Sequence, residues 1–255
     1  MRLASWIPTD AHAAPLVDLV QRAEAAVLEQ LLAELRRDSL ASALGILPRI
    51  RAALERLLGG RVVSDALTDV GERARAAAER SWSEQVHRAV GRELALDMTP
   101  GRELLETWIA DNTARISGLR TETAKRLADD LETAIRSSVR PEDLAAKWQR
   151  EGVPTRHGTL RGRAIVIARD QLGTLAGQIA EQQQRALGIT HYTWDAARHV
   201  SRTHRPEHLQ RHGQRYAWAS APADGHPGRP ILCQCRALAD VDAVELRRRV
   251  TTARL

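Results

Sequence analysis

The sequence predicts a mainly α-helical protein in which a helical amino-terminal region is followed by a small α+β domain. Through about the first 155 residues, apolar side chains recur at three- and four-residue steps, which is typical of amphipathic helices. After Gly188, short segments with strand propensity alternate with glycine and proline. With 43% hydrophobic and 27% charged residues, the 255-residue chain has the composition of a globular protein with a real core.

The helical region is expected to begin near Asp10, where an apolar face follows at helical spacing: Leu16, Val20, Ala23, Val27, Leu31 and Leu35. Pro48 suits the first turn of a short helix that ends at Gly59-Gly60. A longer helix is expected from there to Thr99-Pro100. Two further helices are expected, one around Trp108 and the next around Leu131.

Arg140-Pro141 marks the start of another helix, because proline suits the first position and the following Glu142 and Asp143 suit the first turn. It should end at Gly152. A turn-rich stretch, 153–158, leads to a long helix that Gly188 caps in the left-handed conformation, and residues 189–194 form a strand. The predicted organisation is a helical, partner-binding region at 1–155, a compact α+β domain at 156–240 and a basic helix or tail at 241–255.

The charge is mildly basic and dominated by arginine. The formal net charge is +6, and only two of the 38 basic residues, Lys125 and Lys147, are lysines. Basic and acidic residues alternate along the helices, which favours a solvated helix surface, with DNA contact as the alternative. The segment best suited to contact phosphates carries Arg247, Arg248, Arg249 and Arg254. A solvated helix end explains the same four residues equally well.

Several classes of protein are excluded at this stage. No stretch of about twenty apolar residues is present, so no membrane span is predicted. The first residues lack the apolar core of a secretory signal. Cys233 and Cys235 are the two cysteines, and a pair so close together excludes a disulfide framework and favours a reducing cytoplasm.

Histidines and cysteines gather near the carboxyl end of the chain. His204, His208 and His212 are spaced to share one helix face, and His226 precedes the two cysteines. The pattern suggests a structural zinc site formed by His208, either His212 or His226, Cys233 and Cys235. The alternative is two reduced buried thiols with histidines in ordinary hydrogen bonds. No cofactor is otherwise indicated.

A catalytic use of the same cluster is a further alternative. A cysteine nucleophile needs an activating base and a third, orienting group, and no such signature surrounds either cysteine. A metal-dependent nuclease needs acidic partners, and the nearby acids are Asp195, Glu207 and Asp224. A stand-alone DNA-binding protein is the third possibility. The sequence therefore favours a structural protein, with no catalytic residues assigned.

The carboxy-terminal stretch resembles the head-morphogenesis family named after the F protein of phage Mu. Ala168-Arg169-Asp170-Gln171 stands at the family's first signature, Leu187-Gly188-Ile189 at its turn, and Trp194 in its strand. Residues 203–208, with Arg205, Pro206 and His208, resemble the histidine block, followed by Gly213. Residues 227–230 and Cys233-Gln234-Cys235-Arg236 resemble the closing loop.

The likeness begins further upstream, at a helix that contains Trp108 and Asn112. The chain departs from the family pattern at Asp170-Gln171, Thr203 and Gln234. The residues expected to hold the fold of this domain are the motif set: Trp108, Asn112, Arg169, Gly188, Trp194, Arg205, Pro206, His208, Gly213, Cys233, Cys235 and Arg236.

The resemblance implies a non-enzymatic minor capsid protein of a tailed bacteriophage or prophage. Such a protein is made in the host cytoplasm and resides in the virion head, in few copies near the portal vertex. It acts in head assembly and in DNA packaging or ejection. Its implied partners are the portal protein and, as further candidates, the major capsid protein and the packaged DNA, with no membrane.

Overall fold

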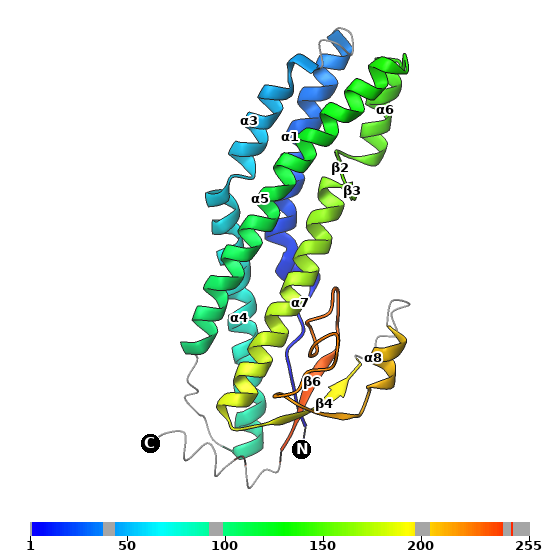
Figure 1. Ribbon diagram of the computed structural model, residues 1–255. Coiled ribbons are helices and arrows are strands. Elements are labelled where there is room, and N and C mark those ends of the chain that lie inside the picture. Colours follow the sequence, from blue (N-terminus) through cyan, green and yellow to red (C-terminus); the bar gives the residue numbers. More distant parts are fainter. Residues whose placement is uncertain (1, 38–43, 92–98, 197–204, 242–245, 247–255) are drawn as a thin grey trace. The chain divides into compact units, whose positions relative to one another are not determined.

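The computed structural model describes residues 2–37, 44–91, 99–196, 205–241 and 246 of the chain (Figure 1). It confirms a mainly α protein with a helical amino-terminal region and a small sheet-containing region near the carboxyl end. The chain divides into two compact units. Unit 1 comprises residues 1–12, 71–108 and 169–255, and unit 2 comprises 13–70 and 109–168. Within the described residues, no helix is long and apolar enough to cross a membrane.

The units are interleaved along the chain, whereas the sequence placed one boundary between residues 155 and 156. Four long helices each contribute residues to both units: α1 (Asp10–Arg37), α4 (Gly60–Val90), α5 (Thr99–Arg136) and α7 (Leu160–Ala186). Helix α5 occupies the stretch where two helices were expected, and this expectation was wrong. A single helix with Gly118 inside it preserves its backbone hydrogen bonds, and burial of Ile116, Leu119 and Leu127 outweighs the small cost of that glycine.

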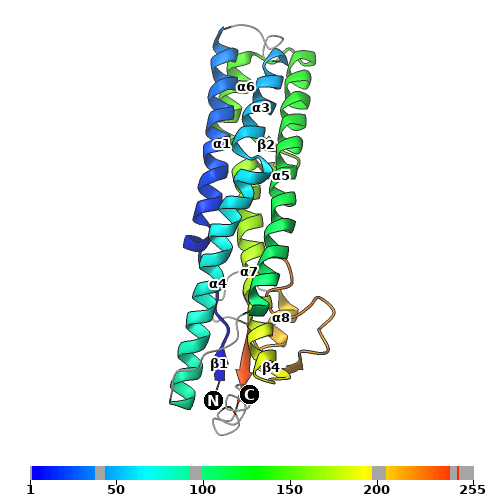
Figure 2. The ribbon, with the colours of Figure 1, turned by 90° about the vertical axis from the view of Figure 1, so that its left-hand side faces the viewer.

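Unit 2 is a helical bundle with a short hairpin. Parts of the four long helices run alongside α3 (Leu47–Leu57) and α6 (Pro141–Glu151) (Figure 2). Its core is aliphatic apart from Trp148: Val20, Val27, Leu31, Ile50, Leu54, Leu127 and Leu131 are buried. The predicted ends of α6 are confirmed, with Pro141 in the first turn and Gly152 at φ 87° beyond the last. The stretch expected as turns contains the hairpin of β2 (Pro154–Thr155) and β3 (Gly158–Thr159).

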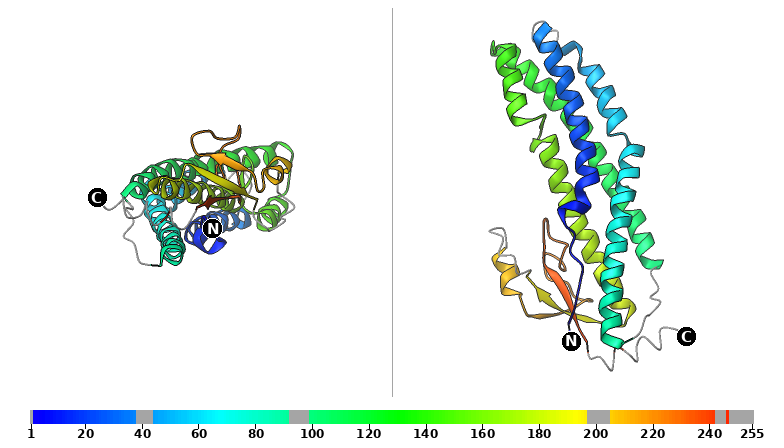
Figure 3. Two further views of the ribbon diagram at one scale, coloured as in Figure 1. Left: turned by 90° about the horizontal axis from the view of Figure 1, so that it is seen from below. Right: turned by 180° about the vertical axis from the view of Figure 1, so that it is seen from behind.

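Unit 1 is built around a four-stranded antiparallel sheet with the order β1-β6-β4-β5 (Figure 3). The strands are β1 (Arg2–Ala4), β4 (His191–Asp195), β5 (Arg215–Ala217) and β6 (Arg236–Asp240). Strand β4 confirms the predicted strand, and Gly188 ends α7 as expected. Gly188 has a φ of 68°, and the Ile189 N–H donates to the Gln184 carbonyl as in a Schellman cap.

Two findings in unit 1 differ from the sequence-based expectations. Strand β1 was not foreseen, since three residues whose partner lies at the other end of the chain leave no periodic pattern. The prediction that His212 shares a helix face with His208 was also wrong, because helix α8 (Pro206–Gln210) ends before His212. His204, Arg247, Arg248, Arg249 and Arg254 lie outside the described residues.

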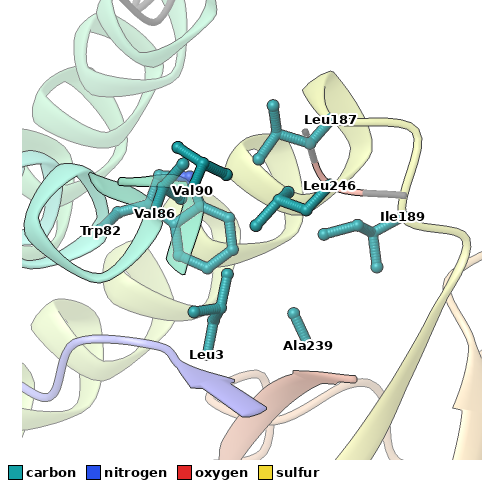
Figure 4. Close-up of a cluster of buried hydrophobic side chains, with 8 residues drawn as sticks. All are labelled: Leu3, Trp82, Val86, Val90, Leu187, Ile189, Ala239 and Leu246. Atoms are coloured by element: carbon teal, nitrogen blue, oxygen red, sulfur yellow. The ribbon is translucent and has the colours of Figure 1, made fainter. Parts of the chain in front are cut away.

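One apolar cluster of unit 1 joins helix ends to the sheet (Figure 4). Trp82, Val86 and Val90 from α4 meet Leu3 from β1 and Ala239 from β6. Leu187, Ile189 and Leu246 complete this cluster. A second cluster surrounds Tyr192, Trp194 and Trp218. Half of the eight tryptophans and tyrosines of the chain therefore belong to this second cluster, which also contains Cys233 and Cys235.

Because Leu3 is only 2% exposed, replacing it with alanine should destabilise unit 1 by about 2–4 kcal/mol, through lost apolar burial and the remaining cavity. The neighbouring exposed Arg2 provides the control, and Arg2→Ala should change stability by less than about 0.5 kcal/mol. Urea unfolding followed by tryptophan emission measures both. Equal stabilities of the two variants would show that β1 does not pack into this cluster.

Candidate functional site

Three buried side chains of unit 1 converge on one point. The sulfurs of Cys233 and Cys235 lie 3.6 Å and 3.5 Å from Nδ1 of His208. The three potential ligand atoms all lie within 4.8 Å of one another. We call His208, Cys233 and Cys235 the His–Cys cluster. It contains three of the five residues that the sequence offered as metal ligands, and no other histidine, cysteine or acid of the described part of the chain joins it.

The orientation of His208 is set by a carboxylate behind it. Helix α8 begins at Pro206, a favourable first residue, and presents His208 to the interior. Nε2 of His208 lies 2.9 Å from Oδ2 of Asp224. Because an ionised carboxylate only accepts hydrogen bonds, Nε2 must carry the proton. In the neutral imidazole, the lone pair of Nδ1 therefore faces the two sulfurs.

Asp224 is held in turn by Arg211, which donates a hydrogen bond to its other oxygen. Burial opposes ionisation of Asp224, but the hydrogen bonds from His208 and Arg211 outweigh it and lower the pKa of this carboxyl. Asp224 is thus a negatively charged acceptor for the histidine ring. The sequence analysis noted it only as a nearby acid.

The segment that carries the cysteines is fixed against helix α7. A Cβ placed on Gly177 would lie 2.4 Å from the Pro227 carbonyl oxygen, so a side chain at this position would displace the backbone of the loop. The hydroxyl of Thr174 donates to the Gly228 carbonyl over 3.2 Å. Asp170 accepts a hydrogen bond of 2.7 Å from the N–H of Leu232, whose φ is 55°. These contacts place Cys233 directly after a constrained turn.

The two thiols share a proton unequally. The pKa of Cys233 is lowered to about 6, mainly because the S–H of Cys235 donates a hydrogen bond to it, with help from the N–H groups of Gly228 and Cys235. The pKa of Cys235 is raised, because its proton is held by Cys233 and because the site is buried. The hydrogen bond between the two thiols therefore favours the thiolate form of Cys233 and the protonated form of Cys235.

Trp194 forms the wall of the site on strand β4. Its ring lies edge-on to His208, with the centroids 5.3 Å apart, and the guanidinium of Arg211 lies 5.0 Å from the ring centroid. The indole N–H is buried and makes no hydrogen bond to any described nitrogen or oxygen. It faces the Cys235 sulfur closely enough to lower the pKa of that thiol in part.

His212 and His226 lie outside the cluster. Nδ1 of His212 accepts a hydrogen bond from the N–H of Ala196 over 3.2 Å. Nδ1 of His226 is hydrogen-bonded to the Tyr192 hydroxyl over 2.9 Å. Burial lowers the pKa of His226 and raises the pKa of Tyr192. Of the three histidines proposed as ligands, the structure therefore brings only His208 to the cysteines.

Several motif residues organise the surroundings of the cluster. Arg236 donates two hydrogen bonds, of 3.0 Å and 2.6 Å, to Asp195, its partner across strands β6 and β4. Arg205 donates to the Ile231 carbonyl over 3.1 Å, which links α8 to the loop of residues 227–235, called the cysteine loop below. Gly213, at φ 80°, donates its N–H to the Trp194 carbonyl.

The remaining motif residues lie on helices. The indole of Trp108 donates to the Gln171 carbonyl over 2.9 Å, which joins α5 to α7 within unit 1. Arg169 pairs with Asp10 over 2.7 Å. Asn112 is buried in unit 2.

Gln184 is a buried side chain of α7 that the sequence analysis missed. Its Nε2 donates to the Ala237 carbonyl of β6, and its Oε1 accepts from the indole of Trp218, both over 3.0 Å. A single amide thus joins α7, the central sheet and the start of the loop that leads to the cysteines. A polar residue among alanines and glutamines of a helix gives no local signal of such a role.

The close approach at Gly177 gives a direct test of how the loop is held. Gly177→Ala should destabilise unit 1 by about 1–3 kcal/mol, because the methyl group meets backbone rather than a movable side chain. Gly118 has open space around its Cα, so Gly118→Ala should leave stability unchanged or raise it by up to about 1 kcal/mol. Urea denaturation of the two variants measures this difference. A Gly177→Ala protein as stable as the wild type would refute the close approach.

Replacing Gln184 with methionine keeps the length of the side chain but removes both hydrogen bonds. The Ala237 carbonyl and the Trp218 indole would remain buried without this partner, so we expect a loss of about 2–4 kcal/mol. Thr174→Val removes a single, longer hydrogen bond and should cost less than about 1.5 kcal/mol. Thermal unfolding of both variants tests this order, and the reverse order would contradict it.

Comparison with known proteins identifies a family model and a relative that are similar to this chain. Residues 120–238 match the model of a family described as "Phage Mu protein F like protein". A curated protein of Haemophilus influenzae (strain ATCC 51907 / DSM 11121 / KW20 / Rd), described as uncharacterized, is 28% identical over 134 residues. That similarity covers 52% of this chain and 28% of the relative, so the chain spans well under a third of that protein. No solved structure matches the chain.

Proposed function

Through residues 120–238 the chain belongs to the Phage Mu protein F like family, and on this basis we propose that it is a minor head protein of a tailed bacteriophage or prophage. The family match is the observation that carries the proposal. It extends from the middle of α5 to β6, so it contains the whole His–Cys cluster and its supports on α7. In this proposal the protein resides in the virion, in few copies, and acts in head assembly and in DNA packaging or ejection.

We propose the portal protein as the principal partner, with the major capsid protein and packaged DNA as secondary contacts. Large apolar side chains are exposed where α8 meets the cysteine loop: Leu209 is 50% exposed and Ile231 is 67% exposed. The hydrogen bond from Arg205 to Ile231 keeps these two segments together. Exposed apolar side chains held on a rigid frame are typical of protein interfaces. The bundle helices of the region 1–155 remain a second candidate surface for the portal.

The nuclease alternative lacks a free acidic base beside the cluster among the described residues. A hydrolytic metal site needs an open coordination position and a base for the attacking water. Asp224, the acid nearest the cluster, is engaged by both His208 and Arg211. Incubation of the purified protein with DNA and divalent metals decides the matter. Cleavage that His208→Ala abolishes would replace our proposal with an enzymatic one.

The decisive experiment uses the phage or prophage whose genome carries this chain. Quantitative mass spectrometry of purified procapsids and virions should find the protein at far fewer copies than the major capsid protein. Crosslinking in the same particles should connect it to the portal. Absence from both kinds of particle would overturn the proposal.

The proposed contact surface can be tested in the same system. Combining Leu209→Asp with Ile231→Asp should reduce incorporation into procapsids several-fold, because charged groups cannot be buried at an apolar contact without a large cost. Val166, at 37% exposed on α7, lies outside both candidate surfaces and provides a matched control, and Val166→Asp should be incorporated normally. Normal incorporation of the double variant would exclude this surface and direct attention to the bundle helices.

A further inference from the structure

We propose that His208, Cys233 and Cys235 bind one zinc ion, with a fourth position open to water or to a partner's side chain. This inference goes beyond the proposed function, because it concerns the chemistry of unit 1 and holds whether or not the protein works at a portal. Four features of the cluster support it: its dimensions, the direction of the histidine lone pair, the donors around the sulfurs and the balance of charge.

The dimensions of the cluster fit a tetrahedral ion. Zinc binds thiolate sulfur at about 2.3 Å and imidazole nitrogen at about 2.0–2.1 Å, and tetrahedral angles then separate the nitrogen from each sulfur by about 3.6 Å. The separations in the cluster are 3.5 Å and 3.6 Å. The ligands therefore need little movement to receive the ion, and the entropic cost of ordering them is met by the fold.

The histidine presents its lone pair to both sulfurs at once. Nε2 is protonated towards Asp224, so Nδ1 has a single lone pair. A thiol–imidazole hydrogen bond would bring one sulfur to the lone pair, and the hydrogen bond between the two thiols does not require the other sulfur to lie equally close to Nδ1. Two sulfurs at nearly equal distances from one lone pair are the arrangement of three ligands around a common centre. A carboxylate behind a ligating imidazole is also the usual outer support of a zinc histidine.

Hydrogen-bond donors surround the sulfurs. The backbone N–H groups of Gly228 and Cys235 point at the Cys233 sulfur. The Trp194 indole N–H faces the Cys235 sulfur and has no nitrogen or oxygen acceptor among the described residues. A buried donor left without an acceptor costs about 1–3 kcal/mol. A zinc-bound thiolate would accept this N–H, whereas a neutral thiol is a weak acceptor.

The charge balance suits a buried site. Both cysteines bind as thiolates and release to solvent the protons that they still carry, the imidazole stays neutral, and two thiolates cancel the charge of Zn²⁺. A net neutral centre avoids the penalty for an isolated buried charge. The soft thiolate ligands select against Mg²⁺ and Ca²⁺, which prefer oxygen. The chain has two cysteines, fewer than the four that an iron–sulfur cluster ordinarily takes.

The first test measures metal in the full-length wild-type protein. Protein purified without chelator, or refolded with equimolar Zn²⁺ under reducing conditions, should contain about one zinc per chain by elemental analysis. Replacement with Co²⁺ should give the visible absorption of tetrahedral cobalt and a thiolate charge-transfer band. Chelation should lower the melting temperature, because the ion joins α8, the cysteine loop and β6. Protein that stays metal-free in excess Zn²⁺ and gives no cobalt spectrum would overturn the proposal.

Variants then assign the ligands. Cys235→Ser should lose nearly all zinc affinity, measured by competition with a chromogenic chelator. Asp224→Asn keeps every ligand and should weaken binding by about 10–100-fold, because the amide supports the imidazole less well than the carboxylate. His212→Gln is the matched control, since His212 is 56% exposed and outside the cluster, and its affinity should equal the wild type's.

The proposal can still be tested if Cys235→Ser does not fold. Far-ultraviolet circular dichroism reports its helix content, and wild-type stoichiometry together with Asp224→Asn decides the question if it is unfolded. Wild-type affinity in a folded Cys235→Ser protein would exclude this site. A loss in His212→Gln as large as that in Asp224→Asn would also contradict the three-ligand assignment.

Discussion

The carboxy-terminal site depends on how helix α7 holds an otherwise irregular loop. Gly173 and Gly177 lie one turn apart and allow the backbone of residues 227–233 to approach the helix directly. Asp170 and Thr174 then supply one hydrogen bond each to that backbone. Since the loop itself has little regular structure, its cysteines can be aligned with His208 only if the helix fixes the loop.

The sheet supplies the second constraint. Strands β4 and β6 pair so that Trp194 lies opposite Ala237 and Asp195 opposite Arg236. The Asp195–Arg236 pair holds the start of β6 next to the end of β4, directly after Cys235. Gln184 fixes the same strand from the helix side. The sulfurs are thus positioned by two independent frames, a helix and a sheet, and this rigidity suits either a metal centre or a contact surface for a partner.

Local signals in the sequence predicted local features well. Pro141 and Gly152 delimit α6, and Gly188 ends α7, because proline and glycine act through their own backbone geometry. Periodicity identified helices but not their continuity, so α5 was divided in two. Strand β1 escaped prediction because its stability comes from β6 and from the cluster around Trp82, more than seventy residues away in sequence.

The candidate site was predicted in composition and missed in arrangement. The Cys-x-Cys pair and His208 were identified, whereas His212 and His226 were ligand candidates that proximity in sequence could not distinguish from His208. The contact of Asp224 with His208 was not predicted, because Asp224 lies in a turn 16 residues after His208. Two glycines four residues apart in α7 were the available signal for the close approach of the loop.

The pairing of β1 with β6 has a consequence for synthesis of the chain. Arg2 is opposite Asp240, so β1 cannot form as a strand until the much later residues of β6 have been synthesised. Contacts of such high sequence separation are slow to close. Until then, Leu3 and the apolar face of α4 around Trp82 lack the partners that cover them in the finished fold. The sheet of unit 1 therefore closes late in folding, and the partly folded protein is most prone to aggregation before it does.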